Sequence, residues 1–220
     1  MKLLLTSNGL SNDSIAKALI ELVCKKADEI SIAFIPTAMN VNVGDKEWFI
    51  DDLYNIKKQG FKMIDIVDIS ALPKDVWLPR LQEADVLFFS GGNSFHLMRC
   101  INESGLAELL PELLKTRVWA GISAGSMVTN PTLALSSKDK KIYYEEKFGY
   151  KIEKALGFVD FYTRPHFNSP DFPQANKEYL EDMAKGFTDT IYALDDDSAL
   201  KIIDGNVEVI TEGKYLVINK

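Results

Sequence analysis

The five residues Gly121-Ile122-Ser123-Ala124-Gly125 form the pattern in this sequence that points most directly to chemistry. The apolar run 118–122 is typical of a buried strand, and a helix is expected to begin after the serine. A serine at such a strand-to-helix turn occupies a strained backbone position that requires small neighbours, and its hydroxyl projects above the sheet. The pattern predicts Ser123 as a nucleophile, and a serine that only caps the helix is the alternative.

A second candidate segment, Ser90-Gly91-Gly92-Asn93-Ser94, follows another apolar run. Adjacent glycines allow backbone N–H groups to approach a ligand closely, so Gly91 and Asn93 are assigned to substrate binding. Together with the N–H of Ala124, the amides of this turn are candidates for an oxyanion hole. A phosphate-binding turn competes with this interpretation, but no Gly-Lys-Ser or Gly-Lys-Thr follows. A plain turn with Asn93 or Ser94 as the helix cap is the structural alternative.

A serine nucleophile needs a base at neutral pH, and the chain has two histidines. His96 follows the double-glycine turn on an expected helix, where simple packing is the better interpretation. His166 lies in the segment 163–168, which is neither helical nor alternating, and Pro165 favours an extended residue before it. An imidazole on such a segment can reach a site formed by other strand ends, so His166 is the favoured base.

The composition is that of an ordinary globular protein, with 46% hydrophobic residues, 26% charged residues and a net charge of -7. No basic run is long enough to predict nucleic-acid binding. Cys24 and Cys100 lie far apart and predict buried free thiols in a reducing cytoplasm, without a disulfide or metal site. The leucines at 3–5 are too short a run for a signal peptide or a membrane span. We therefore expect a cytoplasmic protein with no metal, cofactor, membrane or nucleic-acid partner.

The elements that must position these residues alternate along the chain. Short apolar runs predict strands at 3–5, 30–35, 63–67, 85–89 and 118–122. Amphipathic stretches predict helices at 11–26, 47–59, 78–84, 94–100, 106–115 and 177–185. Near-continuous apolar strands between helices predict an α/β fold, a three-layer sandwich with a mostly parallel sheet and helices on both faces.

The last third of the chain has a different pattern. No clear period is visible from Pro131 to Pro165. Four short apolar runs then follow at 191–194, 199–203, 207–210 and 215–218. The residues Asp204-Gly205-Asn206 mark a tight turn between two of them. We expect antiparallel strands near the C-terminus, added to the edge of the sheet, in a single domain of residues 1–220.

The order of these segments resembles the dipeptidase E and cyanophycinase family of serine peptidases, from residue 1 to about residue 200. The resemblance implies a fold related to class I glutamine amidotransferases. It also implies Ser123 as nucleophile, His166 as general base and the amides of Gly92 and Ala124 as the oxyanion hole. The segments that carry the resemblance are Leu3-Leu4-Leu5-Thr6-Ser7-Asn8, Phe34-Ile35-Pro36, Gly91-Gly92-Asn93-Ser94-Phe95, the serine pattern, Pro165-His166-Phe167 and Leu194-Asp195-Asp196-Asp197-Ser198-Ala199-Leu200.

The acid that should orient the histidine departs from the family pattern. In dipeptidase E an aspartate follows the nucleophile in a Thr-Thr-Asn-Asp segment, and in cyanophycinase a glutamate follows a little later. The comparable stretch here is Ser136-Ser137-Lys138-Asp139, so Asp139 is the first choice. Glu145, Glu146 and the neutral Ser137 are the alternatives.

The resemblance also bears on substrate and activity. Dipeptidase E cleaves after an N-terminal aspartate, which calls for a cationic recognition group, and Arg164 beside His166 is the candidate. We expect a serine exopeptidase or dipeptidase whose partner is a short peptide, with a homodimer left open. Another serine amidase or esterase is the alternative, as is a catalytically decayed binding module on the same fold.

Overall fold

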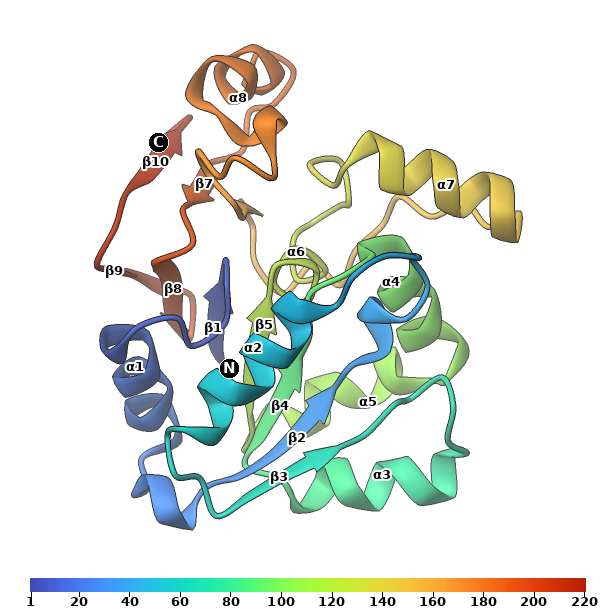
Figure 1. Cartoon of the computed structure of the whole chain (residues 1–220), viewed down its shortest axis with the longest axis vertical. Coiled ribbons are helices and arrows are strands. Elements are labelled where there is room, and N and C mark those ends of the chain that lie inside the picture. The colour runs from blue at the N-terminus through green and yellow to red at the C-terminus, as the bar shows by residue number, and fades with distance from the viewer.

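The computed structural model describes residues 1–220, which form a three-layer α/β sandwich around a seven-stranded sheet (Figure 1). The strand order is β3-β2-β4-β5-β1-β8-β9. The first five strands in this order are parallel, and β8 and β9 add antiparallel pairs at the C-terminal edge. The mostly parallel sheet with antiparallel C-terminal strands is therefore confirmed. The strands are β1 Lys2–Thr6, β2 Ser31–Ile35, β3 Met63–Ile66, β4 Val86–Phe89, β5 Val118–Ile122, β8 Ser198–Ile203 and β9 Asn206–Thr211.

Alternate residues of the strands enter two separate hydrophobic cores, which explains the layers. Leu4 and Phe34 pack on one face with side chains of α1 and α2, and Leu3 and Trp119 pack on the other face with α3, α4 and α5. Parallel strands buried on both faces are expected to read as continuous apolar runs, as these do. These helices are α1 Asp13–Val23, α2 Glu47–Lys57, α3 Lys74–Glu83, α4 Ser94–Glu103 and α5 Leu106–Leu113. No helix is both long enough and apolar enough to cross a bilayer. Cys100 on α4 is buried as expected, but the expectation is wrong for Cys24, which is exposed because it lies just beyond the end of α1.

A second, three-stranded sheet lies at the end of the molecule far from α3 (Figure 1). Its order is β10-β7-β6, with β6 at Tyr162–Arg164, β7 at Ile191–Leu194 and β10 at Tyr215–Ile218. The expectation that all four C-terminal strands join the main sheet is thus wrong for β7 and β10. The helix α8, Lys177–Ala184, covers this small sheet through Leu180 and Ala184.

The segment without a sequence period contains a helix, α7, at Lys138–Phe148. Only one of its residues, Tyr144, is fully buried, so it lacks the apolar stripe by which surface helices are recognised. Its N-terminus is capped by the Ser137 side chain, which accepts a hydrogen bond from Lys140 N–H.

The strand register brings four loops to one edge of the main sheet. Thr6 at the end of β1 pairs with Ile122 at the end of β5, and Phe89 at the end of β4 pairs with Gly121. Since β8 runs antiparallel to β1, Thr6 also pairs with Ala199 near the beginning of β8. The residues after β1, β4 and β5 and the residues before β8 therefore meet, as ligand-binding loops do in open α/β sheets.

The two glycines of the serine pattern are required by close backbone approach. A Cβ on Gly121 would lie 2.5 Å from the Gly125 carbonyl carbon, and a Cβ on Gly125 would lie 2.9 Å from the Phe89 carbonyl carbon. The turn between β5 and the short helix α6, Ala124–Met127, can close only without these side chains.

Replacing Gly125 with alanine is therefore expected to lower the free energy of unfolding by about 1–3 kcal/mol, the usual cost of overpacking. Urea denaturation of the variant and the wild type measures the difference. Gly186→Ala is the matched control, because its new Cβ would make only ordinary contact with the Met183 carbonyl oxygen at 3.6 Å. Equal stabilities for the two variants would contradict the argument.

Candidate active site

Ser123 occupies the turn between β5 and α6 in a conformation that residues with a side chain rarely adopt. Its φ is 47° and its ψ is -99°, and its N–H donates a 3.1 Å hydrogen bond to the Thr6 carbonyl oxygen. A positive φ outside glycine is strained and persists only when the surrounding structure imposes it. The strained position at the strand-to-helix turn agrees with the sequence pattern, and Ser123 is half-buried there.

The imidazole of His166 faces this serine. His166 Nε2 lies 2.9 Å from Ser123 Oγ, and the residue follows β6 with a positive φ of 65°. Its ring stacks on Phe172 at a centroid distance of 4.0 Å and an interplanar angle of 6°. The structure thus brings together the predicted nucleophile and the predicted base, although they are 43 residues apart in sequence.

The other imidazole nitrogen contacts Asp196, which lies just before β8. His166 Nδ1 is 2.7 Å from Asp196 Oδ1. Burial would raise the pKa of Asp196, but hydrogen bonds from His166, Ser7 and Ser169 and the attraction of the imidazolium outweigh it, so this pKa lies below its usual value. The carboxylate is therefore ionised at neutral pH and fixes the imidazole proton on Nδ1, which leaves Nε2 as the acceptor for the Ser123 hydroxyl.

Ser7, the first residue after β1, links the base and the acid. Its hydroxyl accepts a 2.8 Å hydrogen bond from His166 N–H and donates a 2.8 Å hydrogen bond to Asp196 Oδ1. The side chain is fully buried, so these two bonds replace the hydrogen bonds that the hydroxyl would otherwise make with water. One hydroxyl therefore fixes the backbone of the histidine and the side chain of the carboxylate relative to each other.

The choice of Asp139 as the partner of His166 is wrong, because Asp196 occupies that place. Asp139 lies exposed in the first turn of α7, and that helix also carries Glu145 and Glu146. None of these acids, nor Ser137, is within hydrogen-bond distance of the imidazole. Asp196 lies in the Leu194–Leu200 segment, which contributed only to the family resemblance and was not among the predicted acids. Nothing in its three consecutive aspartates marks one of them as the partner of the histidine.

The backbone amides predicted for an oxyanion hole are available. The N–H groups of Gly92 and Ala124 donate no hydrogen bond within the protein. Gly92 has a φ of 137°, and any Cβ there would collide with the Ala38 backbone, so only glycine fits this turn. Unpaired amides beside a nucleophile are the groups that bind a developing oxyanion.

The other residues predicted for substrate binding have different surroundings. Gly91 lines the cleft that contains Ser123. Asn93 is fully buried, and its side chain caps α4 by accepting from the N–H groups of Phe95 and His96 at 3.0 and 3.2 Å. His96 contacts the Tyr144 hydroxyl at 3.1 Å, and mainly burial lowers its pKa, in agreement with its interpretation as a packed residue.

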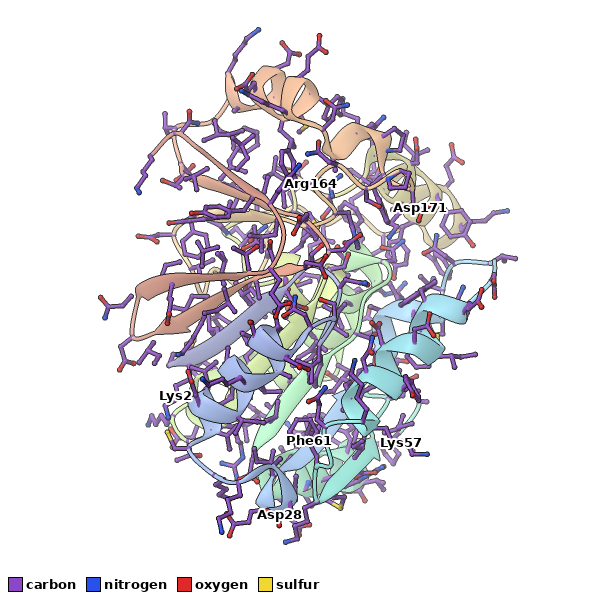
Figure 2. All side chains as sticks on the ribbon, turned by 60° about the vertical axis from the view of Figure 1, so that its left-hand side comes forward. Lys2, Asp28, Lys57, Phe61, Arg164 and Asp171 are labelled. Carbon is purple, nitrogen blue, oxygen red and sulfur yellow. The ribbon has the colours of Figure 1, made fainter.

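Arg164 is buried in β6 and donates a 3.3 Å hydrogen bond to the Pro165 carbonyl oxygen. It is not among the residues that line the cleft. Figure 2 shows Arg164 and Asp171 at the end of the molecule opposite Asp28 and Lys57, which precede β2 and β3. Both therefore lie on the side of the carboxyl ends of the strands, but only Asp171 reaches the cleft.

The cleft has a volume of about 500 Å³, and charges of both signs line it. Lys140 reaches in from α7 and donates a 2.6 Å hydrogen bond to the Gly92 carbonyl oxygen. Burial, and then the neighbouring Arg164 and Lys46, lower the pKa of Lys140 to about 8. Sequence reasoning missed Lys140 as a cleft residue, because α7 itself was not predicted.

Asp52 on α2 brings a carboxyl group to the same cleft. Its side chain is 3% exposed, and its Oδ2 is fully enclosed without a hydrogen-bond partner. Burial, and then the neighbouring Asp51, raise the pKa of Asp52 to about 7. In the sequence it is only one of several acids on an amphipathic helix, and nothing there marks it as buried.

The elbow, the imidazole, the carboxylate and the free amides, placed above a mostly parallel sheet, define the class of α/β serine hydrolases. The model of peptidase family S51 matches residues 3–210, and the chain belongs to this family. The fold is similar to that of a putative peptidase E from Listeria monocytogenes, with a TM-score of 0.76, 23% identity, and coverage of 96% of this chain and 98% of the other.

Two sequence relatives agree with this assignment. The chain is 27% identical to an uncharacterized peptidase of Listeria innocua over 185 residues. This matched region covers 83% of the chain and 84% of the relative. It is 36% identical to peptidase E of Streptomyces coelicolor over 95 residues, a region that covers 43% of the chain and 37% of that relative.

The buried carboxyl of Asp52 predicts a pH-dependent stability. Its pKa rises from 3.8 to about 7 on folding, so between these values the folded state binds the extra proton and stability falls as pH rises. Asp52→Asn removes this penalty, and the variant is expected to gain up to about 4 kcal/mol over the wild type at pH 8 and little at pH 4. Thermal unfolding at the two pH values measures the gain. Asp139→Asn, at an exposed acid, is the control. If the stability gain of Asp52→Asn does not increase with pH, the predicted direction of the pH dependence is wrong.

Proposed function

We propose that this protein hydrolyses short peptides by covalent catalysis at Ser123. The observation that carries the proposal is the continuous hydrogen-bonded series from Ser123 Oγ through both nitrogens of His166 to Asp196 Oδ1. A serine is activated when a base takes its proton and a third group orients that base. Both contacts of the imidazole, with Ser123 and with Asp196, are formed at hydrogen-bond distance, which argues against a decayed binding module.

The reaction follows from these contacts. Ser123 Oγ attacks the scissile carbonyl carbon while His166 Nε2 takes its proton, and the amides of Gly92 and Ala124 face the oxygen that gains charge. The imidazolium, stabilised by Asp196, returns the proton to the leaving amine, and the peptide bond breaks to give an acyl-enzyme. Water then gives a proton to His166 Nε2 as it attacks the carbonyl carbon of the ester. The bond from that carbon to Ser123 Oγ breaks, Nε2 returns the proton to Oγ, and the acid leaves.

The cleft favours a small substrate with an acidic group. Lys140 holds a cation beside the Gly92 turn, and Lys46 lines the same cleft, whereas the predicted Arg164 does not. A compact ammonium at the site of acyl transfer suits a substrate carboxylate. We therefore propose a dipeptidase-type activity in which Lys140, rather than Arg164, receives an acidic side chain, in keeping with the peptidase E family resemblance.

Ser123→Ala is expected to lower kcat/KM by a factor on the order of 10³ or more, because the covalent route disappears. A fluorophosphonate probe should label the wild type and not the variant. The rate of Asp-Leu hydrolysis measures the activity of both proteins. Ser126→Ala is the matched control, because that hydroxyl donates to the carbonyl oxygens of Thr6 and Gly121 and lies away from the imidazole. Labelling that persists in Ser123→Ala would remove the proposed nucleophile.

Asp196→Asn and Asp139→Asn discriminate between the two candidate acids. The first change should lower kcat by up to about 10⁴-fold, because the amide no longer stabilises the imidazolium or its proton on Nδ1. The second should leave kcat within about twofold, since Asp139 is exposed on α7. Steady-state kinetics of both variants decides the assignment, and a larger loss at Asp139 would reverse it.

A further inference from the structure

Asp52 is a buried acid that the hydrolysis mechanism does not use. No hydrogen bond or ion pair joins its carboxyl group to the rest of the protein, and its Oδ2 is fully enclosed. Buried carboxyl groups are normally paired, because an unpaired one lowers stability. An unpaired carboxyl that lines a cleft is therefore expected to find its partner in a ligand.

The position of Asp52 connects it to the nucleophile. At Gly9, a Cβ would lie 3.2 Å from Asp52 Oδ1 and 3.1 Å from Ile122 Cδ1, so the carboxyl group lies close to the residue that precedes Ser123. Trp48, one helical turn earlier on α2, also lines the cleft and lies 3.4 Å from the corresponding Cβ position at Gly91. The same face of α2 thus forms the wall of the cleft beside the elbow.

The charges in the cleft are separated. Lys140 donates to Gly92 on the α7 side, and Lys46 donates to the carbonyl oxygens of Asn42 and Gly44, so neither lysine neutralises Asp52. A cation that reaches Asp52 must then come from the substrate. A peptide always carries one at a free N-terminus, two bonds from its first carbonyl carbon, about 2.5 Å away.

We propose that Asp52 binds the α-ammonium group of the substrate's N-terminal residue and thereby directs Ser123 to the first peptide bond. This inference rests on the proposed function and deepens it, because it assigns recognition of the free N-terminus, which exopeptidase action requires, to one side chain of the cleft. Lys140 receives an acidic side chain on one side of the cleft, and Asp52 receives the ammonium group on the other. A peptide with a blocked N-terminus would leave the Asp52 carboxyl unpaired and buried, which disfavours its binding.

Binding to the Ser123→Ala protein tests the inference without catalysis. Isothermal titration calorimetry compares Asp-Leu with N-acetyl-Asp-Leu, and the free dipeptide is expected to bind at least tenfold more tightly. Adding Asp52→Asn should abolish this preference, because the amide keeps the shape but carries no charge. Asp51→Asn, at the exposed neighbouring acid, should keep it.

Each other outcome overturns the inference. Equal affinities for the two peptides, or no binding of either at millimolar concentration, would exclude an ammonium site at Asp52. A preference that survives Asp52→Asn would place the site elsewhere. If N-acetyl-Lys-Leu binds in an Asp52-dependent manner and Asp-Leu does not, the residue recognises a basic side chain instead.

The fluorophosphonate probe separates this inference from the proposed function. A wild-type protein that is labelled at Ser123 but shows no N-terminal preference retains the hydrolase and loses only the Asp52 assignment. A protein that is not labelled loses the proposed nucleophile, and calorimetry on the Ser123→Ala protein still reports whether Asp52 binds an ammonium group.

Discussion

The antiparallel pairing of β8 with β1 is the constraint on which the site depends. It pairs Thr6 with Ala199, and so brings the residues after β1 against the residues before β8. Ser7 then donates to Asp196 and accepts from His166, two residues that are 30 positions apart in the sequence. Without this pairing the contacts that hold the elbow, which come from β1, β4, β5 and two glycines, would remain, but Asp196 would not be placed beside the imidazole.

The sequence was most informative where a function is encoded by neighbouring residues. The elbow is such a case, because Gly121 and Gly125 are required by backbone contacts within a few residues of Ser123. The parallel sheet was also predictable, because each central strand is buried on both faces and reads as a continuous apolar run. His166 could be chosen because only two histidines exist and the other belongs to a helix.

Features that arise from long-range packing could not be predicted in the same way. Which of three consecutive aspartates meets His166 depends on the register of β8 against β1. The prediction of Asp139 rested instead on the stretch 136–139, which is comparable to the Thr-Thr-Asn-Asp segment of dipeptidase E. Lys140 was missed because α7 has one fully buried residue and therefore no apolar stripe. Asp52 was missed because burial of a charge on an amphipathic helix leaves no trace in the pattern of apolar residues.

The acids of the cleft differ in the partners that the fold provides. This difference distinguishes the carboxylate proposed for catalysis from the one proposed for substrate recognition. Asp196 has His166 and Ser7 as partners, so its charge is stabilised by the protein itself. A carboxylate that stabilises an imidazolium must already be in place when the imidazolium forms. Asp52 has no such partners, so its charge is stabilised only when a cation enters. The stable double-faced sheet beneath them can tolerate both the strained φ of Ser123 and this unpaired acid, because neither lies in its hydrophobic cores. In the proposed function, reactivity is thus built into contacts within the protein, whereas the proposed selectivity for a charged N-terminus arises only on binding.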